Sequence, residues 1–301
     1  EYNGVRPMIN TECRIVLKEA RHPLMEKSVC VPLDFTIGEN RDGEQITGVI
    51  ITGPNTGGKT VTLKTVALCS MMAQCGLHVP CKAADICMNA NFLCDIGDGQ
   101  NLAENLSTFS AHLKNILEIL QNVNCESLVV LDELGSGTDP TEGMGIAIAI
   151  LEELRKSGAI FLVTTHYPEV KEYAKDTEGI INARMLFDKE TLCPTYQMVI
   201  GEAGESCAFY IADRLGMPSE MLKVAIRAAY GEDAVSSYTF SNQPSNIAKK
   251  SKNKITKAKK AKNSNVLTTK YKIGDSVMVY PDKKIGIVCV PINEKGVLRV
   301  Q

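Results

Sequence analysis

The chain has 301 residues, enough for one large α/β domain and a smaller one. Hydrophobic residues make up 44% and charged residues 23%. No apolar run reaches the about 18 residues of a membrane span, so we expect no membrane partner. The net charge of -2 is unevenly distributed, because eight lysines and no acidic residue lie between 249 and 262. The other 25 of the 33 basic residues stand against 35 acidic ones, which leaves the rest of the chain acidic.

Eleven cysteines occur without a C-x-x-C pair. This odd number favours reduced, buried thiols in a cytoplasmic protein. A metal site at Cys75, Cys81, Cys87 and Cys94 with His78 is the less favoured alternative, because zinc ligands usually lie closer in sequence. The chain begins with Glu1 and has no signal-peptide pattern, which is compatible with a fragment of a longer protein.

Residues 1–47 predict short strands and turns that flank a nucleotide site. Arg21 and His22 are candidates for contacts to the base or ribose. A solvent-facing turn before Pro23 is an equally good interpretation.

The segment between Gly48 and Cys75 contains the motif around which the chain is organised. An apolar run at 49–51 leads to a glycine-rich loop, and a helical run follows. Strand, loop and helix in this order are typical of a P-loop, whose glycines let backbone amides surround an anion. We predict phosphate contacts from Lys59 and a Mg²⁺ contact from the Thr60 hydroxyl. The predicted nucleotide-binding residues are Gly53, Pro54, Asn55, Thr56, Gly57, Gly58, Lys59 and Thr60.

Residues 77–100 are expected to be rich in loops, with Pro80 and a turn at 97–100. A helix follows, because apolar residues recur at three- and four-residue steps from Leu106 to Leu120. Ser107 or Thr108 is a candidate N-cap for this helix, and a helix N-terminus also attracts phosphate.

The next predicted strand, Leu128–Leu131, ends in Asp132 and Glu133. Ligands bind at the carboxyl ends of parallel strands, so Asp132 is expected to support Mg²⁺ and Glu133 to orient or deprotonate water. A helix capped by Asp139 is expected to end at Gly158. The strand after it ends near His166, which is expected to contact the γ-phosphate or the water.

Residues 180–200 predict a hairpin, and 206–229 predict two helices around a turn at 216–219. This helix-turn-helix has few basic residues, so we favour packing or dimerisation over DNA reading. Residues 236–269 are predicted to form a lysine-rich disordered linker that could contact a polyanion. Residues 270–301 predict a small β-barrel that follows an ATPase domain at 1–235.

Several motifs together resemble the MutS ATPase domain. They are Arg21-His22-Pro23, Gly53 to Thr60, Leu106 to Ser110, Asp132 to Thr138 and Thr165-His166-Tyr167. Asn55 to Thr60, Asp95 to Asp98 and Thr138-Asp139-Pro140 look like the second bacterial branch of that family. The C-terminal segment resembles a KOW-type module.

The resemblance implies an α/β P-loop NTPase of the ABC-like type, with a mostly parallel sheet flanked by helices. It implies a homodimer that hydrolyses ATP with Mg²⁺, in which Lys59, Glu133 and His166 are the catalytic residues. Residues of one subunit would complete the nucleotide site of the other. These trans-acting residues would be Ser107, Gly135, Ser136, Gly137 and Thr138.

The second branch is associated with suppression of homologous recombination and with rescue of collided ribosomes. We therefore expect an ATP-driven clamp on branched or mismatched DNA in DNA repair. The alternative is an ATP-driven factor that binds ribosomes and rRNA. A nucleotide-gated scaffold without turnover is disfavoured because Glu133 is present.

The sequence departs from the resemblance in two respects. Mismatch-repair relatives have an aromatic residue for adenine stacking near the position of Cys30-Val31-Pro32. Neither a mismatch-reading domain nor the small nuclease domain of this branch is recognised in the 301 residues, so no nuclease activity is assigned to the chain.

Overall fold

The computed structural model describes residues 4–39, 43–54, 57–97, 108–188, 192–204, 206–238, 276–279, 284–290 and 299–300. The chain divides into two compact units, Glu1–Ile247 and Ala248–Gln301. The domain boundaries predicted at 235 and 269 remain predictions. The lysine-rich segment 249–262 lies outside the described residues.

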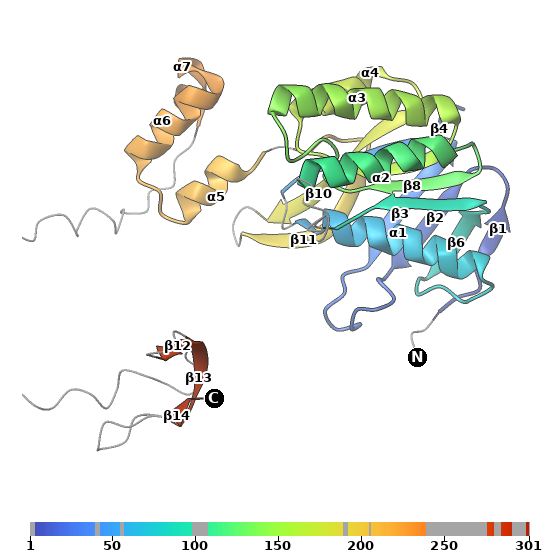
Figure 1. Cartoon of the computed structure of the whole chain (residues 1–301), viewed down its shortest axis with the longest axis horizontal. Coiled ribbons are helices and arrows are strands. Elements are labelled where there is room, and N and C mark those ends of the chain that lie inside the picture. Colours follow the sequence, from blue (N-terminus) through green and yellow to red (C-terminus); the bar gives the residue numbers. More distant parts are fainter. Residues whose placement is uncertain are drawn as a thin grey trace, which may run out of the picture. The chain divides into compact units, whose positions relative to one another are not determined.

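A six-stranded sheet forms the centre of the first unit (Figure 1). Four of its five strand pairs are parallel, and only the hairpin of β10 and β11 is antiparallel. The mostly parallel α/β sheet that the resemblance implies is therefore confirmed. Its strands, in spatial order, are β11 (Cys193–Ile200), β10 (Ile180–Asp188), β5 (Gly48–Thr52), β9 (Ile160–Thr164), β8 (Ser127–Leu131) and β7 (Asn91–Asp95).

Both faces of this sheet are covered, which explains why its central strands are apolar throughout. Along β5, Val49 and Ile51 pack in one core cluster and Ile50 in the other. Helix α1 (Lys59–Gln74) belongs to the first cluster. The second cluster includes α2 (Thr108–Asn122), α3 (Pro140–Ser157) and α4 (Pro168–Asp176), which Figure 1 draws together on the opposite face.

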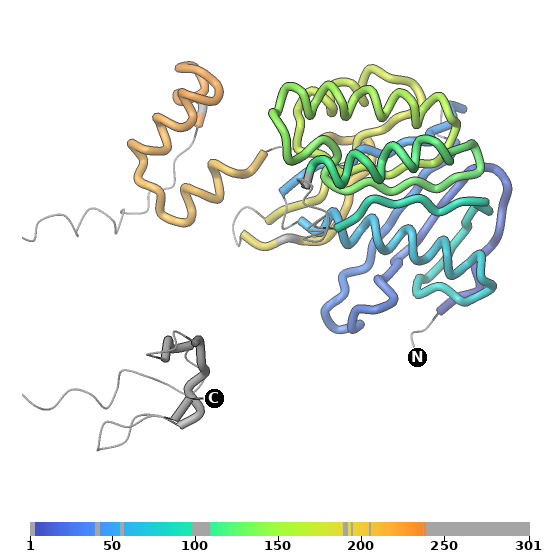
Figure 2. Tube along the Cα trace, in the orientation of Figure 1, coloured from blue at the N-terminus to red at the C-terminus, as the bar shows by residue number. Residues whose placement is uncertain are grey.

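A second, five-stranded sheet packs against the far side of α1. Its Phe35, Leu17 and Ile15 share one core cluster with Leu63 and Val66 of α1, so this helix is buried between two sheets. The trace in Figure 2 follows the chain through both sheets. The strand order is β1 (Met8–Asn10), β6 (Ala83–Cys87), β2 (Ile15–Ala20), β3 (Leu33–Glu39) and β4 (Gln45–Ile46).

The loop-rich segment expected at 77–100 is wrong in part, since it contains β6 and β7. The two strands belong to different sheets, and each pairs with strands distant in sequence. β6 pairs with β1 and β2, and β7 pairs with β8. Their sequences, AADIC and NFLCD, contain acidic and small residues, so their strand structure depends on these partners.

Among the described residues of the first unit, three helices follow β11. They are α5 (Ala208–Arg214), α6 (Ser219–Tyr230) and α7 (Glu232–Ser237). The chain turns between α5 and α6 at Gly216, whose φ of 91° favours glycine. Helix α7 was not predicted, and it contacts α6.

The described residues of the second unit form a three-stranded antiparallel sheet. Its strands are β12 (Ser276–Val279), β13 (Lys284–Val290) and β14 (Arg299–Val300). A closed barrel and its KOW-type character remain predictions. In neither unit do the described residues include a helix both long and apolar enough to cross a membrane.

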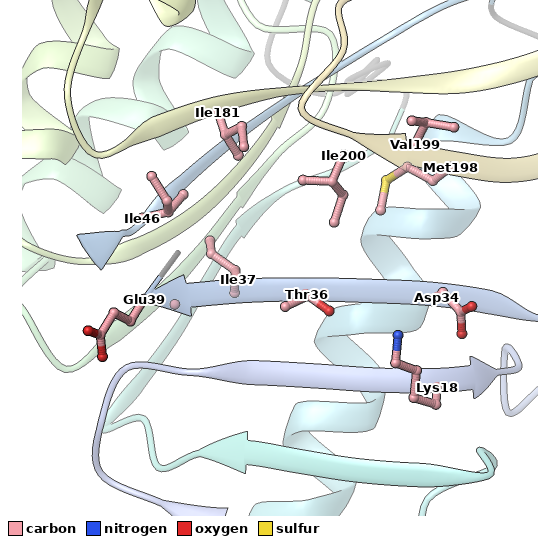
Figure 3. Close-up of a pocket in the computed structure, with 11 residues that line it drawn as sticks. Lys18, Asp34, Thr36, Ile37, Glu39, Ile46, Ile181, Met198, Val199 and Ile200 are labelled. Atoms are coloured by element: carbon pink, nitrogen blue, oxygen red, sulfur yellow. The ribbon is translucent and has the colours of Figure 1, made fainter. Parts of the chain in front are cut away.

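An open groove of about 530 Å³ lies between the two sheets of the first unit (Figure 3). Thr36 and Ile37 of β3 form one side, and Met198 and Ile200 of β11 form the other. Its lining shares no residue with the P-loop, which instead lies at the carboxyl end of β5, where parallel sheets bind ligands.

Candidate functional site

The P-loop joins the end of β5 to the start of α1 as predicted. Gly58 is the residue before the helix, and its φ of 90° lies in the left-handed region. Gly53 has φ 132°, and a Cβ on Gly57 would lie 3.1 Å from Met185 Cβ. The backbone therefore favours glycine at Gly53 and Gly58, and Gly57 leaves little room for a side chain, as in a phosphate-binding loop. Asn55 and Thr56 lie outside the described residues.

Lys59 is the first residue of α1, and only 3% of it is exposed. Its Nζ donates a hydrogen bond of 2.8 Å to the Gly53 carbonyl. Burial lowers the pKa of this ammonium to about 8, although Glu133 and Asp132 partly oppose the shift. A buried cation gains electrostatic energy from a nearby anion. The position therefore fits a phosphate group.

Asp132 lies directly after β8 and meets two hydroxyl groups. Thr60 Oγ1 donates to Asp132 Oδ2 at 2.6 Å, and Thr164 Oγ1 donates to Asp132 Oδ1 at 2.5 Å. The structure thus brings together the two residues predicted to bind Mg²⁺. A carboxylate beside a hydroxyl supplies the oxygen ligands that Mg²⁺ prefers, so these residues fit the ion.

Glu133 occupies a strained position next to Asp132. Its φ is 51°, which is uncommon for a residue with a side chain, and its N–H donates to Thr164 Oγ1 at 2.7 Å. Its Oε1 lies 3.7 Å from His166 Nε2. Both side chains are nearly half exposed, at 49% and 44%. Such exposure leaves the carboxylate accessible to water.

His166 links Glu133 to the P-loop lysine. Its Nε2 lies 3.5 Å from Lys59 Nζ. Burial lowers the His166 pKa, and the Lys59 ammonium adds to the shift although Glu133 opposes it. This favours a neutral imidazole, which can donate or accept a hydrogen bond. The three predicted catalytic residues therefore lie at one edge of the sheet.

The loop Gly135–Thr138 is fixed against α3 and α4. Tyr167 Oη donates to the Gly135 carbonyl at 2.7 Å, and a Cβ on Gly135 would lie 2.5 Å from the Gly143 carbonyl oxygen. Ser136 N–H donates to the Glu133 carbonyl. The loop predicted to act on the second subunit is therefore bonded to Glu133 of its own subunit. Ser107 lies outside the described residues.

Tyr196 of β11 is a neighbour of the P-loop that the sequence analysis did not name. A Cβ on Gly58 would lie 2.6 Å from its ring. Tyr196 lines a pocket of about 70 Å³ together with Val31 and Leu33. The Tyr196 ring thus lies beside the P-loop. It shares its pocket with Cys30 and Val31, at the segment where mismatch-repair relatives have their aromatic residue. No motif around Tyr196 pointed to this position, because it depends on the pairing of the hairpin with the sheet.

His22 lies in a different, open pocket of about 640 Å³, which Arg21 and Lys27 also line. Its Nδ1 accepts from the Leu24 N–H at 3.3 Å. Burial lowers its pKa, with a further contribution from Lys64 of α1. It does not line the pocket of Tyr196, so its predicted base or ribose contact remains a prediction.

The alternative metal site finds no support in the described part of the chain. Within these residues no group of three or more His, Cys, Asp or Glu side chains could hold a metal ion. Of the cysteines, Cys81 and Cys87 are buried, and burial raises the pKa of each thiol to about 11. Cys75 and Cys94 are exposed, so only part of the set consists of buried thiols.

Comparison with known proteins identifies the family. The model of MutS domain V matches residues 49–231, which include every described candidate site residue except Arg21 and His22. The chain is 48% identical over 223 residues to the protein named Endonuclease MutS2 of Bacillus cytotoxicus. It is 49% identical over 224 residues to that of Ruminiclostridium cellulolyticum. Each alignment covers 74% of this chain and 28% of the relative, so the chain spans little more than a quarter of their length.

The match and the site lead to the same assignment. Domain V is the ATPase domain of the MutS family, and the phosphate loop and paired carboxylates are the parts that ATP hydrolysis needs. The predicted resemblance to MutS and to its second bacterial branch is confirmed. The chain belongs to the MutS domain V family and carries an ATPase.

Proposed function

We propose that the chain is the engine of a homodimeric clamp that uses ATP hydrolysis to close on branched DNA and release it. The observation that carries this proposal is the convergence of Lys59, Asp132, Glu133 and His166 at one edge of a parallel sheet. Membership in the MutS family supports DNA as the substrate of the clamp.

Each site residue has a proposed role. Lys59 and the amides of the P-loop bind the phosphates, while Thr60 and Asp132 hold Mg²⁺. When bound, Mg²⁺ supplies positive charge to the phosphate oxygens. Glu133 orients or deprotonates the attacking water, and neutral His166 donates a hydrogen bond to the γ-phosphate.

Two subunits would share each nucleotide in this proposal. Ser107 and the loop Gly135–Thr138 of one subunit would face the phosphates bound by the other. Helix α6 offers a surface for association, because Met221 and Val224 are 58% and 60% exposed. Exposed apolar side chains of this size favour contact with a second apolar surface.

Branched DNA is the proposed cargo. The lysines between 249 and 262 provide a cationic segment for the phosphate backbone, and binding should weaken strongly as salt rises. The relatives named Endonuclease MutS2 are more than three times as long as the aligned part, and we assign no nuclease chemistry to this chain.

Glu133→Gln tests the proposal. We expect the variant to bind ATP, to lose hydrolysis by about 100-fold or more, and to accumulate as an ATP-bound dimer. Co-sedimentation of this variant with four-way DNA junctions and with ribosomes, each with and without ATP, identifies the cargo. Selective ATP-dependent binding to junctions supports the proposal, and selective binding to ribosomes contradicts it. Hydrolysis at the parent rate would show that Glu133 has another role.

A further inference from the structure

Asp95 is a buried carboxylate at the end of β7, and none of the roles proposed above uses it. Only 7% of the residue is exposed. Its carbonyl accepts the Asp132 N–H at 2.9 Å, so it lies on the strand end next to the site. A buried carboxylate is costly unless it is paired and hydrogen-bonded. The partners of Asp95 therefore indicate why it is there.

Both partners belong to α2. His112 Nδ1 donates to Asp95 Oδ2 at 2.7 Å, and Asn115 Nδ2 donates to Asp95 Oδ1 at 2.8 Å. Asn115 Nδ2 also lies 3.2 Å from the Cys94 carbonyl. Because His112 and Asn115 are three residues apart, they share one face of the helix. We call Asp95, His112 and Asn115 the α2 anchor, because they fasten this helix to the end of β7.

The same face of α2 reaches the loop Gly135–Thr138. Phe109 lies one turn before His112, and a Cβ on Gly137 would lie 3.4 Å from Phe109 Cβ. Gly137 has φ 88°, so the loop approaches Phe109 closely through a backbone that only glycine adopts easily. Tyr167 holds the other end of the loop at Gly135. The loop is thus held between α4 and α2.

We propose that the α2 anchor positions the loop Gly135–Thr138 for the nucleotide of the second subunit. This inference rests on the proposed dimer. The anchor residues act through Phe109 and the loop, so they are positioning residues and do not contact ATP. The anchor meets the site of its own subunit through the backbone, where the Asp95 carbonyl accepts the Asp132 N–H, while the P-loop leads into α1. Removing an α2 side chain leaves that backbone bond in place, so we expect the ATP affinity of the same subunit to change little.

The first test separates binding from turnover. His112→Ala removes one bond to Asp95 and should lower kcat about 10- to 100-fold, because a misplacement of about 1 Å can have this effect. The affinity for ATP should stay within about twofold of the parent. His112→Asn places an N–H near the position of Nδ1 and should restore most of kcat. Asn122→Ala, at the exposed end of α2, is the matched control and should leave kcat unchanged.

The second test asks which subunit is affected. Equal amounts of His112→Ala and Glu133→Gln are mixed without nucleotide, and ATP is added after subunit exchange. In a mixed dimer, one site combines the intact Glu133 of the first variant with the intact loop of the second. If the anchor acts across the dimer, this site hydrolyses ATP and two poorly active proteins regain activity together. Ser107→Ala mixed with Glu133→Gln serves as the reference for the dimer itself.

The outcomes are distinct. Recovery with both His112→Ala and Ser107→Ala supports the anchor. Recovery with Ser107→Ala alone overturns the anchor and leaves the dimer standing. Recovery with neither variant overturns both the shared site and the anchor. A weakened ATP affinity of His112→Ala with unchanged kcat also contradicts the proposal. Thermal unfolding of each variant, followed by circular dichroism, identifies any that fail to fold, and for these Asp95→Asn takes the place of His112→Ala.

Discussion

At the scale of single residues, Thr164 connects Asp132 and Glu133, the two neighbouring acidic residues of the site. Its hydroxyl donates to Asp132 and accepts the backbone N–H of Glu133. One hydroxyl therefore bonds the carboxylate proposed to hold Mg²⁺ and also the backbone of Glu133, whose φ lies in the left-handed region. Backbone strain of this kind costs about 1–3 kcal/mol and persists where surrounding bonds maintain it. The arrangement fixes the backbone of Glu133.

Tyr196 is predicted to stack on the nucleotide base. Its ring lies beside Gly58, where an adenine attached to phosphates in the P-loop could reach it. Stacking on an aromatic side chain contributes about 1–3 kcal/mol per base, so Tyr196→Ala should weaken ATP binding about 10-fold or more. Titration of a fluorescent ATP analogue measures the affinity.

Tyr196→Phe is the control, because it keeps the ring and removes only the hydroxyl. It should bind ATP with nearly the parent affinity. If Tyr196→Ala also bound with the parent affinity, the base would have to lie elsewhere, and the pocket of His22 would become the next candidate.

At the scale of secondary structure, the elements predicted correctly are those with strong local signals. The strands ending at Leu131 and Thr164 are buried on both faces and therefore apolar throughout. The glycine-rich loop before α1 predicts that a helix begins there. β6 and β7 were missed because their residues favour strands only in the company of partners distant in sequence. The position of Tyr196 beside the P-loop was not predicted for the same reason, because it depends on the pairing of β11 with β10.

The packing of β5 on β9 yields a prediction about stability. A Cβ on Gly48 would overlap Phe161 Cζ, and the Phe161 ring is fully buried. Gly48→Ala should therefore destabilise the protein by about 1–3 kcal/mol through overpacking. Urea denaturation followed by circular dichroism measures the loss.

Phe161→Leu provides the matched background for this substitution. It removes ring atoms near Gly48, so Gly48→Ala should cost less in this variant than in the parent. An equal loss of unfolding free energy in the two backgrounds would mean that the Phe161 ring does not cause the destabilisation.

At the scale of the whole molecule, ATP turnover is expected to depend on association. The site at the strand ends of one subunit is open, since Glu133 and His166 remain nearly half exposed. A second subunit that covers these side chains would exclude bulk water and strengthen their electrostatic interactions. Hydrolysis per subunit should therefore rise with protein concentration until dimers predominate.

Val224→Glu is predicted to weaken dimerisation. The substitution places a charge in the exposed apolar surface of α6, and burying that charge should reduce association about 10-fold or more. Sedimentation velocity over a range of concentrations measures the dimer fraction.

Ser219→Glu introduces the same charge on the same helix, at its exposed first residue. A carboxylate there is favourable for the helix dipole, so this control should associate as the parent does. If both variants dimerised like the parent, the interface would have to exclude α6.

The burial of α1 between two sheets has a mechanical consequence. Its first residue, Lys59, belongs to the P-loop, while its last residue, Gln74, bonds the backbone of Asn89 on the way from β6 to β7. Leu63 and Val66 pack in the cluster that also contains Phe35 of the five-stranded sheet. A close-packed interior transmits displacement because it compresses little. We therefore expect a displacement of the P-loop to be passed through α1 to the residues of the five-stranded sheet that pack on this helix.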